Sequence, residues 1–136
     1  MQQETLQDGC WTEKMALGVH TMDASHQELF NEIQRLADAT DQEFAATFAA
    51  FVVKVEQDFN QEESWMEEIE FREIKPHLEE HARVLSALHH AAPHVVGGNL
   101  TAGREIIRLM PQWFLHHLAT QDKPLALALQ MASIPV

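Results

Sequence analysis

Several residue types that support common protein chemistries are missing or rare in this chain of 136 residues. Tyrosine is absent, which excludes a tyrosyl radical, a tyrosinate ligand and a tyrosine general acid. A single cysteine, Cys10, excludes an intramolecular disulfide, a zinc site built on cysteines and an iron–sulfur cluster. Because disulfides belong to oxidising compartments, the composition favours the cytoplasm.

Basic residues are also scarce, since 9 Lys and Arg stand against 21 Asp and Glu, a formal charge of −12. Binding to nucleic acid or to an anionic membrane surface requires clustered Lys and Arg, so we expect neither partner. The chain shows no signal-peptide pattern, and no apolar run approaches the roughly 20 residues that span a bilayer. These absences predict a soluble protein.

Apolar residues recur with the 3.6-residue period of an amphipathic helix in four segments, whereas the alternation typical of strands is missing. The first segment follows Ser25-His26-Gln27-Glu28, whose S-x-x-E pattern predicts a capping box at Ser25. The other three are expected at about 42–69, 75–95 and 101–120. A short apolar stretch at 125–131 predicts a fifth helix.

The connections between these segments are short, so successive helices should lie antiparallel. This predicts an all-α fold, an up-down-up-down four-helix bundle with an N-terminal arm and a short C-terminal helix. We expect one domain over residues 1–136, with an arm at 1–22, the bundle at about 23–121 and a C-terminal piece at 122–136. Trp11 is the expected anchor of the arm.

Side chains that can bind metal interrupt the apolar stripe of every helix. They are His26 in the first segment, Asp58 and Glu62 in the second, His77 and His81 in the third, and His117 in the fourth. The two histidines of the third segment are four residues apart, so both rings point the same way. All these residues are therefore expected in the interior of the bundle.

Asp122 follows His117 by five residues, an offset of about 140° around a regular helix. Its side chain can turn inward only if the helix ends near Thr120. Pro124 favours such an ending, because proline disfavours helical geometry at the preceding residue, Lys123.

Interior carboxylates at positions 58, 62 and 122 would cost roughly several kcal/mol each without compensating positive charge. No Lys or Arg falls on the interior stripes, which leaves a metal centre as the source of that charge. Four imidazoles and three carboxylates exceed one tetrahedral zinc site and suit two ions bridged by carboxylates. A lone histidine on a helix is often an ordinary core residue, so the prediction depends on the joint placement. Five histidines stay unassigned: His20, His89, His90, His94 and His116.

The same residues give the chain a resemblance to bacterial hemerythrins, which are non-haem di-iron proteins with a four-helix-bundle fold. The ferritin-like di-iron pattern needs Glu-x-x-His twice, and this sequence contains none. The resemblance runs from Trp11 to about Leu129 and rests on these segments: Asp23-Ala24-Ser25-His26, Leu29-Phe30-Asn31, Phe59, Glu62 through Met66, His77-x-x-x-His81, Trp113-Phe114-Leu115-His116-His117 and Asp122.

The resemblance implies a cofactor of two non-haem iron ions joined by an oxo or hydroxo bridge. One iron would be held by His77, His81 and His117. Glu62 and Asp122 would bridge to the second iron, which His26 helps to hold. An oxygen pocket is implied at Phe59, Met66, Trp113 and Phe114, residues whose other role is plain bundle core.

Asp58 stands where the family has a further histidine, four residues before the bridging glutamate. A carboxylate favours ferric over ferrous iron, so Asp58 as a ligand would make the site easier to oxidise. The resemblance implies a dioxygen-binding protein for storage, transport, delivery or sensing, with no catalytic residue and no identified protein partner. Two alternatives stay open: a di-iron peroxidase, oxidase or redox sensor, and a metal-holding bundle without oxygen chemistry.

Overall fold

The computed structural model describes residues 11–133, and every regular element within that range is a helix. The long helices are α1 (His20–Asp38), α2 (Asp41–Glu68), α3 (Ile74–Val96) and α4 (Thr101–His117). A π-helical turn, Leu118–Asp122, joins α4 to α5 (Lys123–Ala132), and a short 3-10 turn, Glu13–Met15, precedes α1.

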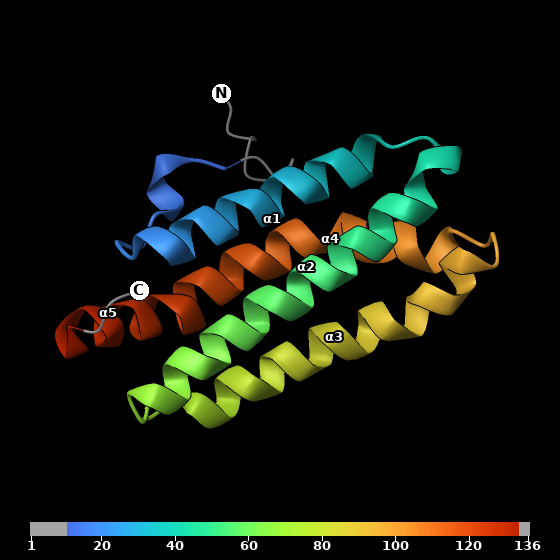
Figure 1. Cartoon of the computed structure of the whole chain (residues 1–136). Helices are drawn as coiled ribbons and strands as arrows, with labels where there is room; N and C mark the ends of the chain where they lie inside the picture. Colours follow the sequence, from blue (N-terminus) through green and yellow to red (C-terminus); the bar gives the residue numbers. More distant parts are fainter. Residues whose placement is uncertain (1–10, 134–136) are drawn as a thin grey trace.

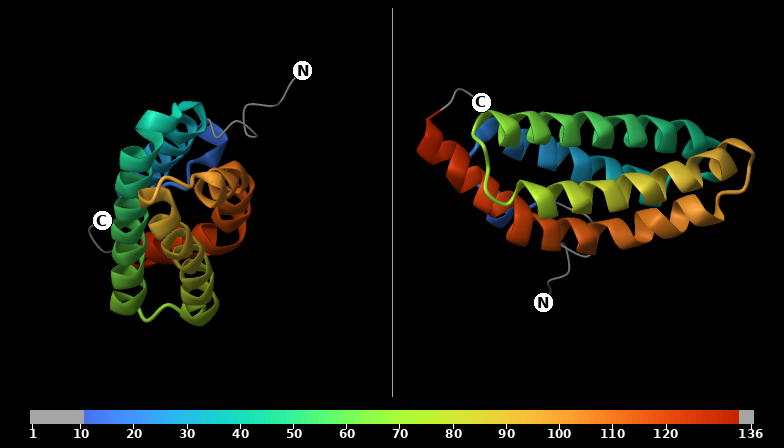
Figure 2. Two further views of the ribbon diagram at one scale, coloured as in Figure 1. Left: turned by 90° about the vertical axis from the view of Figure 1, so that its right-hand side faces the viewer. Right: turned by 90° about the horizontal axis from the view of Figure 1, so that it is seen from below.

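The four long helices form a bundle in which each helix packs against two neighbours (Figure 1). Helix α1 contacts α2 and α4, and α3 also contacts α2 and α4. Successive helices run in opposite directions, and α5 lies across the end of the bundle where α2 connects to α3 (Figures 1 and 2). The predicted all-α, up-down-up-down four-helix bundle is therefore confirmed.

Helix α1 begins earlier than the sequence pattern predicts. Its N-cap is Val19, which places Ser25 inside the helix, so the capping box expected there is wrong. The turn before α1 is held instead by the carboxylate of Asp23, which accepts hydrogen bonds from the backbone N–H groups of Leu17 and Gly18. The backbone of Gly18 has a φ of 95°, a conformation that glycine adopts without steric cost. Helix α1 therefore begins at His20, within the segment expected as the arm.

A capping box does form at the start of α2. The Thr40 hydroxyl accepts from the backbone N–H of Glu43, and the Glu43 carboxylate accepts from the backbone N–H of Thr40. This reciprocal pair satisfies two N–H groups that the first helical turn leaves without partners.

The buried apolar side chains form two clusters along the bundle axis. The larger one fills the middle and the α1–α2 end, with Phe30, Phe48, Phe59 and Phe114 among its members. Trp11 is half-buried and packs on this cluster with its ring centroid 6.3 Å from that of Phe30, as expected for an anchor of the arm.

The second cluster closes the opposite end of the bundle beneath α5. It contains Val19, Met22, Trp65, Met66, Phe71, Leu125, Ala126 and Leu129. Burial of this apolar face explains why the short α5 is a stable helix although it has few turns. Across residues 11–133, no helix combines the length and the apolar character that crossing a membrane requires.

Candidate metal centre

Six buried polar side chains meet in a layer between the two apolar clusters. On α1, His26 stands between Met22 of the α5-side cluster and Phe30 of the larger one. On α2, Glu62 likewise stands between Phe59 and Met66. The six residues are His26, Glu62, His77, His81, His117 and Asp122, and none is more than 5% exposed.

The spacing of the α3 histidines has the predicted effect. His77 and His81 both face the interior, and their rings meet edge to face with centroids 4.6 Å apart. The ring of His117, on the neighbouring helix α4, lies 4.8 Å from that of His77, again edge to face. Three imidazoles from two helices therefore share one small volume.

Asp122 reaches the same volume by a route that the sequence argument did not foresee. The helix does not end near Thr120, because residues 118–122 form a π-helical turn that continues into α5. In that turn the backbone N–H of Lys123 donates to the carbonyl of Leu118, five residues earlier. The wider turn cancels most of the offset between Asp122 and His117, so that Asp122 Oδ1 lies 3.2 Å from His117 Nε2.

The Nε2 atoms of three histidines surround the carboxylate of Glu62. Its Oε1 lies 3.2 Å from Nε2 of His77 and 3.0 Å from Nε2 of His81. Its Oε2 lies 3.2 Å from Nε2 of His26. One carboxylate thus joins histidines from α1 and α3.

Asp122 is surrounded in the same way but without hydrogen bonds. Its Oδ1 lies 3.1 Å from Nε2 of His77, and its Oδ2 lies 3.1 Å from Nε2 of His26. Neither Asp122 oxygen, nor Nε2 of His117, has a hydrogen-bond partner within the described part of the chain. A fully buried carboxylate without hydrogen bonds needs positive charge beside it, because burial removes its water. Protonated histidines supply that charge in the metal-free protein, and a bound cation would supply it in their place.

The donor atoms fall into two groups that share one carboxylate. One group is Glu62, His77, His81 and His117, and the other is His26, Glu62 and Asp122. Within each group the donor atoms lie within 4.8 Å of one another. Imidazole with carboxylate is a donor set for iron, manganese or zinc, so the arrangement is able to hold metal ions.

Two glutamates at the edge of the centre fix the outer nitrogens of the histidines. The Nδ1–H of His81 donates to Glu63 over 3.0 Å, and the Nδ1–H of His117 donates to Glu80 over 2.7 Å. When the imidazole is neutral, each bond leaves the lone pair of Nε2 free to bind a metal ion in the interior. Neither glutamate is predicted from the sequence pattern. Because they are sequence neighbours of Glu62 and His81, both glutamates could have been expected near the centre. Which histidine each one reaches depends on how the helices pack.

The charges of the centre stabilise one another. Burial disfavours a charged imidazole, but close contacts with Asp122 and Glu62 raise the pKa of His26 to about 10 and that of His77 to about 9. Burial lowers the pKa of His117 as well, but Asp122, Glu80 and Glu62 together raise it above its ordinary value. Burial and Asp122 raise the pKa of Glu62, yet the neighbouring histidines lower it to about 2. The pKa of Asp122 is lowered for the same reason.

Asp58 lies outside both donor groups. Its Oδ1 is 3.0 Å from Nζ of Lys54, one turn earlier on α2. The expectation that no Lys or Arg reaches the interior stripes is therefore wrong for this position, since an (i, i+4) lysine compensates Asp58. Whether Asp58 also binds metal stays a prediction.

The residues expected to form an oxygen pocket lie around the histidines, although not all in one place. The ring of Phe59 stacks on His81 with centroids 3.7 Å apart, and half-buried Trp113 stacks on His117 at 4.6 Å. The buried ring of Phe114 stands edge-on to His117 at 6.5 Å. Met66 is buried in the cluster beneath α5.

None of the five unassigned histidines belongs to either donor group. His89 forms a surface pair with Glu56, with 2.6 Å between Nε2 and Oε2. His90 and His94 are exposed one turn apart on α3, with ring centroids separated by 5.6 Å. His20 and His116 are also exposed.

Comparison with known proteins agrees with this geometry. Residues 17–128 match the hemerythrin HHE cation binding domain family. The chain is 29% identical over 113 residues to a bacteriohemerythrin of Ralstonia nicotianae (strain ATCC BAA-1114 / GMI1000), an alignment that covers 83% of this chain and 82% of the relative. No solved structure matches the chain. With a family match over most of its length and a buried cluster of histidines and carboxylates, the chain belongs to the hemerythrin family of cation-binding domains.

Proposed function

We propose that this protein binds dioxygen at a carboxylate-bridged pair of non-haem iron ions and serves in cytoplasmic oxygen storage, delivery or sensing. The observation that carries the proposal is the buried cluster of four imidazoles with Glu62 and Asp122. Among residues 11–133, Asp122 has close nitrogen neighbours but no hydrogen bond. The family that the chain belongs to is the one whose resemblance implies dioxygen binding, and this favours oxygen chemistry over simple metal storage. No residue has to act as a catalytic acid, base or nucleophile.

The two donor groups suggest which residues would hold each metal ion. His77, His81 and His117 would hold one ion through Nε2, and His26 would help to hold the other. Glu62 and Asp122 would bridge the two positions. Bound ferrous iron, once the two ions are joined by an oxo or hydroxo bridge, would supply the electrons that oxygen binding requires.

The aromatic side chains around the histidines would keep water away from the centre. Phe59 is 1% exposed and covers one face of His81, while Trp113 covers one face of His117. Phe114 fills the space beside His117 and is equally buried. By excluding water, these side chains would limit proton delivery to the centre, which favours reversible binding over turnover. We assign Met66 the same role on the side of α5.

The test is to load chelator-treated protein anaerobically with ferrous iron, admit oxygen, remove it again, and follow the visible charge-transfer absorption. Colour that appears with oxygen and disappears on its removal supports the proposal. Failure to bind two irons per chain would overturn it.

A second candidate is a di-iron peroxidase, oxidase or redox sensor. The unequal donor groups favour it, because the group with His26 has one protein donor fewer than the group with His77. An ion with fewer protein ligands is more open to water and to peroxide. Immediate and irreversible oxidation of the iron in the same experiment would favour this candidate over oxygen carriage.

A further inference from the structure

Three side chains on α2 form a row one helical turn apart, and only the last of them belongs to the metal centre. Lys54, Asp58 and Glu62 follow one another at intervals of four residues, which places them along one side of the helix. Glu62 is shared by both donor groups, whereas Asp58 and Lys54 belong to neither. The row leads from the centre to the surface, since the side chain of Asp58 is 11% exposed and that of Lys54 is 23% exposed.

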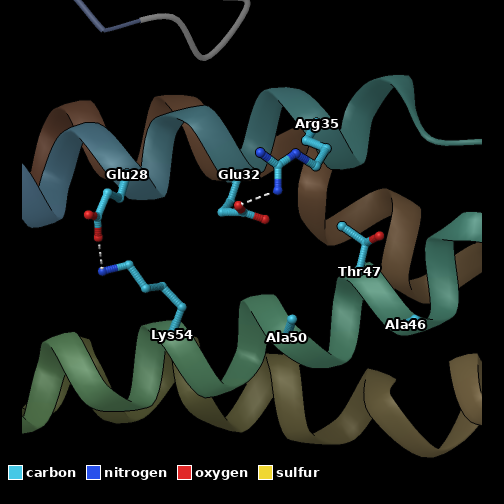
Figure 3. A pocket seen from close by; sticks show the side chains of 7 residues that line it. All are labelled: Glu28, Glu32, Arg35, Ala46, Thr47, Ala50 and Lys54. Atoms are coloured by element: carbon cyan, nitrogen blue, oxygen red, sulfur yellow. Dashed lines mark hydrogen bonds and ion pairs between the residues drawn. The ribbon is translucent and has the colours of Figure 1, made fainter.

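Lys54 joins two carboxylates from different helices. Its Nζ lies 3.0 Å from Oδ1 of Asp58 and 2.7 Å from Oε1 of Glu28 on α1. Figure 3 shows the ammonium group reaching across the groove between α1 and α2 toward Glu28. This groove, of about 520 Å³, also contains a second ion pair, Arg35 with Glu32, which stands apart from Lys54.

Asp58 is close to the metal centre without taking part in it. Its carboxylate interacts electrostatically with both Glu62 and His26. Its Oδ1 is engaged by Lys54, while its Oδ2 is buried and has no hydrogen-bond partner among residues 11–133. A carboxylate with one buried free oxygen, one turn from Glu62, is a donor that the smaller group lacks.

We propose that Lys54 is a positioning residue that holds Asp58 out of the His26 donor group. It thereby lowers the affinity of that group for its metal ion, which binds second, after the ion held by the group with three histidines. The inference rests on the proposed function, because it concerns the same centre. An ammonium group and a divalent cation compete for one carboxylate, and they also repel each other. Lys54 therefore weakens the second site in two ways, while the group with three histidines binds its ion without interference.

The test is calorimetric titration of the chelator-treated full chain with Zn²⁺ at neutral pH, which reports each equivalent separately. The substitution Lys54→Met keeps an apolar stem and removes the charge. It should raise the affinity for the second equivalent by about tenfold or more and change the first equivalent little. Lys54→Arg keeps the charge and should behave like the wild-type protein.

A double variant tests whether Asp58 is the ligand that becomes available when Lys54 is replaced. Adding Asp58→Asn to Lys54→Met should abolish most of the gain, because the amide is a weaker ligand than the carboxylate. Arg35→Met is the matched control, since it removes a cation from the same groove without touching Asp58. It should leave both affinities unchanged.

The inference is overturned if Lys54→Met leaves the second affinity unchanged or lowers it, or if Arg35→Met raises it equally. The proposed function fails separately, when protein loaded with two irons gives no oxygen-dependent colour. Zinc does not react with oxygen, so the titration can be interpreted in either case.

Discussion

Glu80 of α3 accepts a hydrogen bond from Nδ1 of His117 on α4 over 2.7 Å. The opposite nitrogen of the same ring lies 3.2 Å from Oδ1 of Asp122. The imidazole is thus held between an outer carboxylate and an inner one, with its Nε2 aimed at the centre. Since Glu80 lies on the helix that carries His77 and His81, this contact also ties the α4 histidine to those of α3.

Removal of this outer partner should weaken metal binding without unfolding the protein. We expect Glu80→Leu to lower the affinity for the first metal equivalent by about 10- to 100-fold, because the His117 ring loses the partner that orients it. Calorimetric titration with Zn²⁺ measures the change. Glu79→Leu, an exposed neighbour on the same helix, is the control and should have no effect. Equal affinities for wild type and Glu80→Leu would contradict the prediction.

The metal-free protein should lose stability in alkali. The folded-state pKa values of His26 and His77, about 10 and about 9, lie above the 6.5 of an unfolded histidine. Their protonation therefore stabilises the fold fully below pH 6.5, and this contribution disappears as the pH rises through 9 and 10. The pKa of Glu62 is shifted in the opposite direction, from 4.5 in the unfolded chain to about 2 in the fold. Its contribution to stability is therefore complete above pH 4.5 and is lost as the pH falls from there toward 2.

Chelator-treated protein should accordingly be most stable between about pH 4.5 and 6.5, and it should lose on the order of a few kcal/mol by pH 10. Urea unfolding at fixed pH values measures this. A His90→Gln variant, changed at an exposed histidine outside the centre, should show the same pH dependence. Equal stability at pH 6 and pH 10 would show that the buried imidazoles are not charged in the metal-free fold.

The stacked pair of Phe59 and His81 should matter for metal binding beyond its share of the core. Phe59→Leu and Phe48→Leu each shorten a fully buried aromatic side chain on α2, and each should cost about 1 to 3 kcal/mol of unfolding free energy. Of these two phenylalanines, only Phe59 stacks on a proposed metal ligand, His81. We expect faster release of metal to a chelator in Phe59→Leu alone, and comparable release rates in the two variants would refute this.

Gly103 should be intolerant of a side chain although it lies inside α4. A Cβ atom there would stand 2.7 Å from Cγ2 of Val95 and 2.9 Å from Cε2 of Phe44. Alanine improves helix propensity by about 1 kcal/mol, but overpacking costs about 1 to 3 kcal/mol. Gly103→Ala should therefore lower the melting temperature. Adding Val95→Ala should recover part of the loss, and a stabilised single variant would disprove the steric argument.

Much of the architecture could be predicted from the sequence, because helix formation and burial follow a local period. The 3.6-residue recurrence of apolar residues located α2, α3 and α4 to within a few residues. It also indicated that His26, Glu62, His77, His81 and His117 face inward, since their places in that period are fixed by neighbours in the chain.

The wrong predictions came from sequence patterns that are compatible with more than one local structure. The S-x-x-E pattern at Ser25 is compatible with a capping box and also with the middle of a helix. The carboxylate of Asp23 binds the backbone N–H of Leu17 and so stabilises a turn ahead of His20, where α1 begins. Pro124 fits a helix end, but proline is also tolerated in the first turn of a new helix, which is where α5 places it.

The sequence by itself determined the helices, their inward faces and the set of histidines and carboxylates available to a metal. Only the tertiary structure decided how these residues meet. The π-helical turn brings Asp122 beside His117, Glu80 reaches His117 from another helix, and Lys54 binds Asp58 while reaching Glu28 across the groove. The physical reason is that helix periodicity depends on near neighbours, whereas the partners of a buried charge are set by the packing of distant segments.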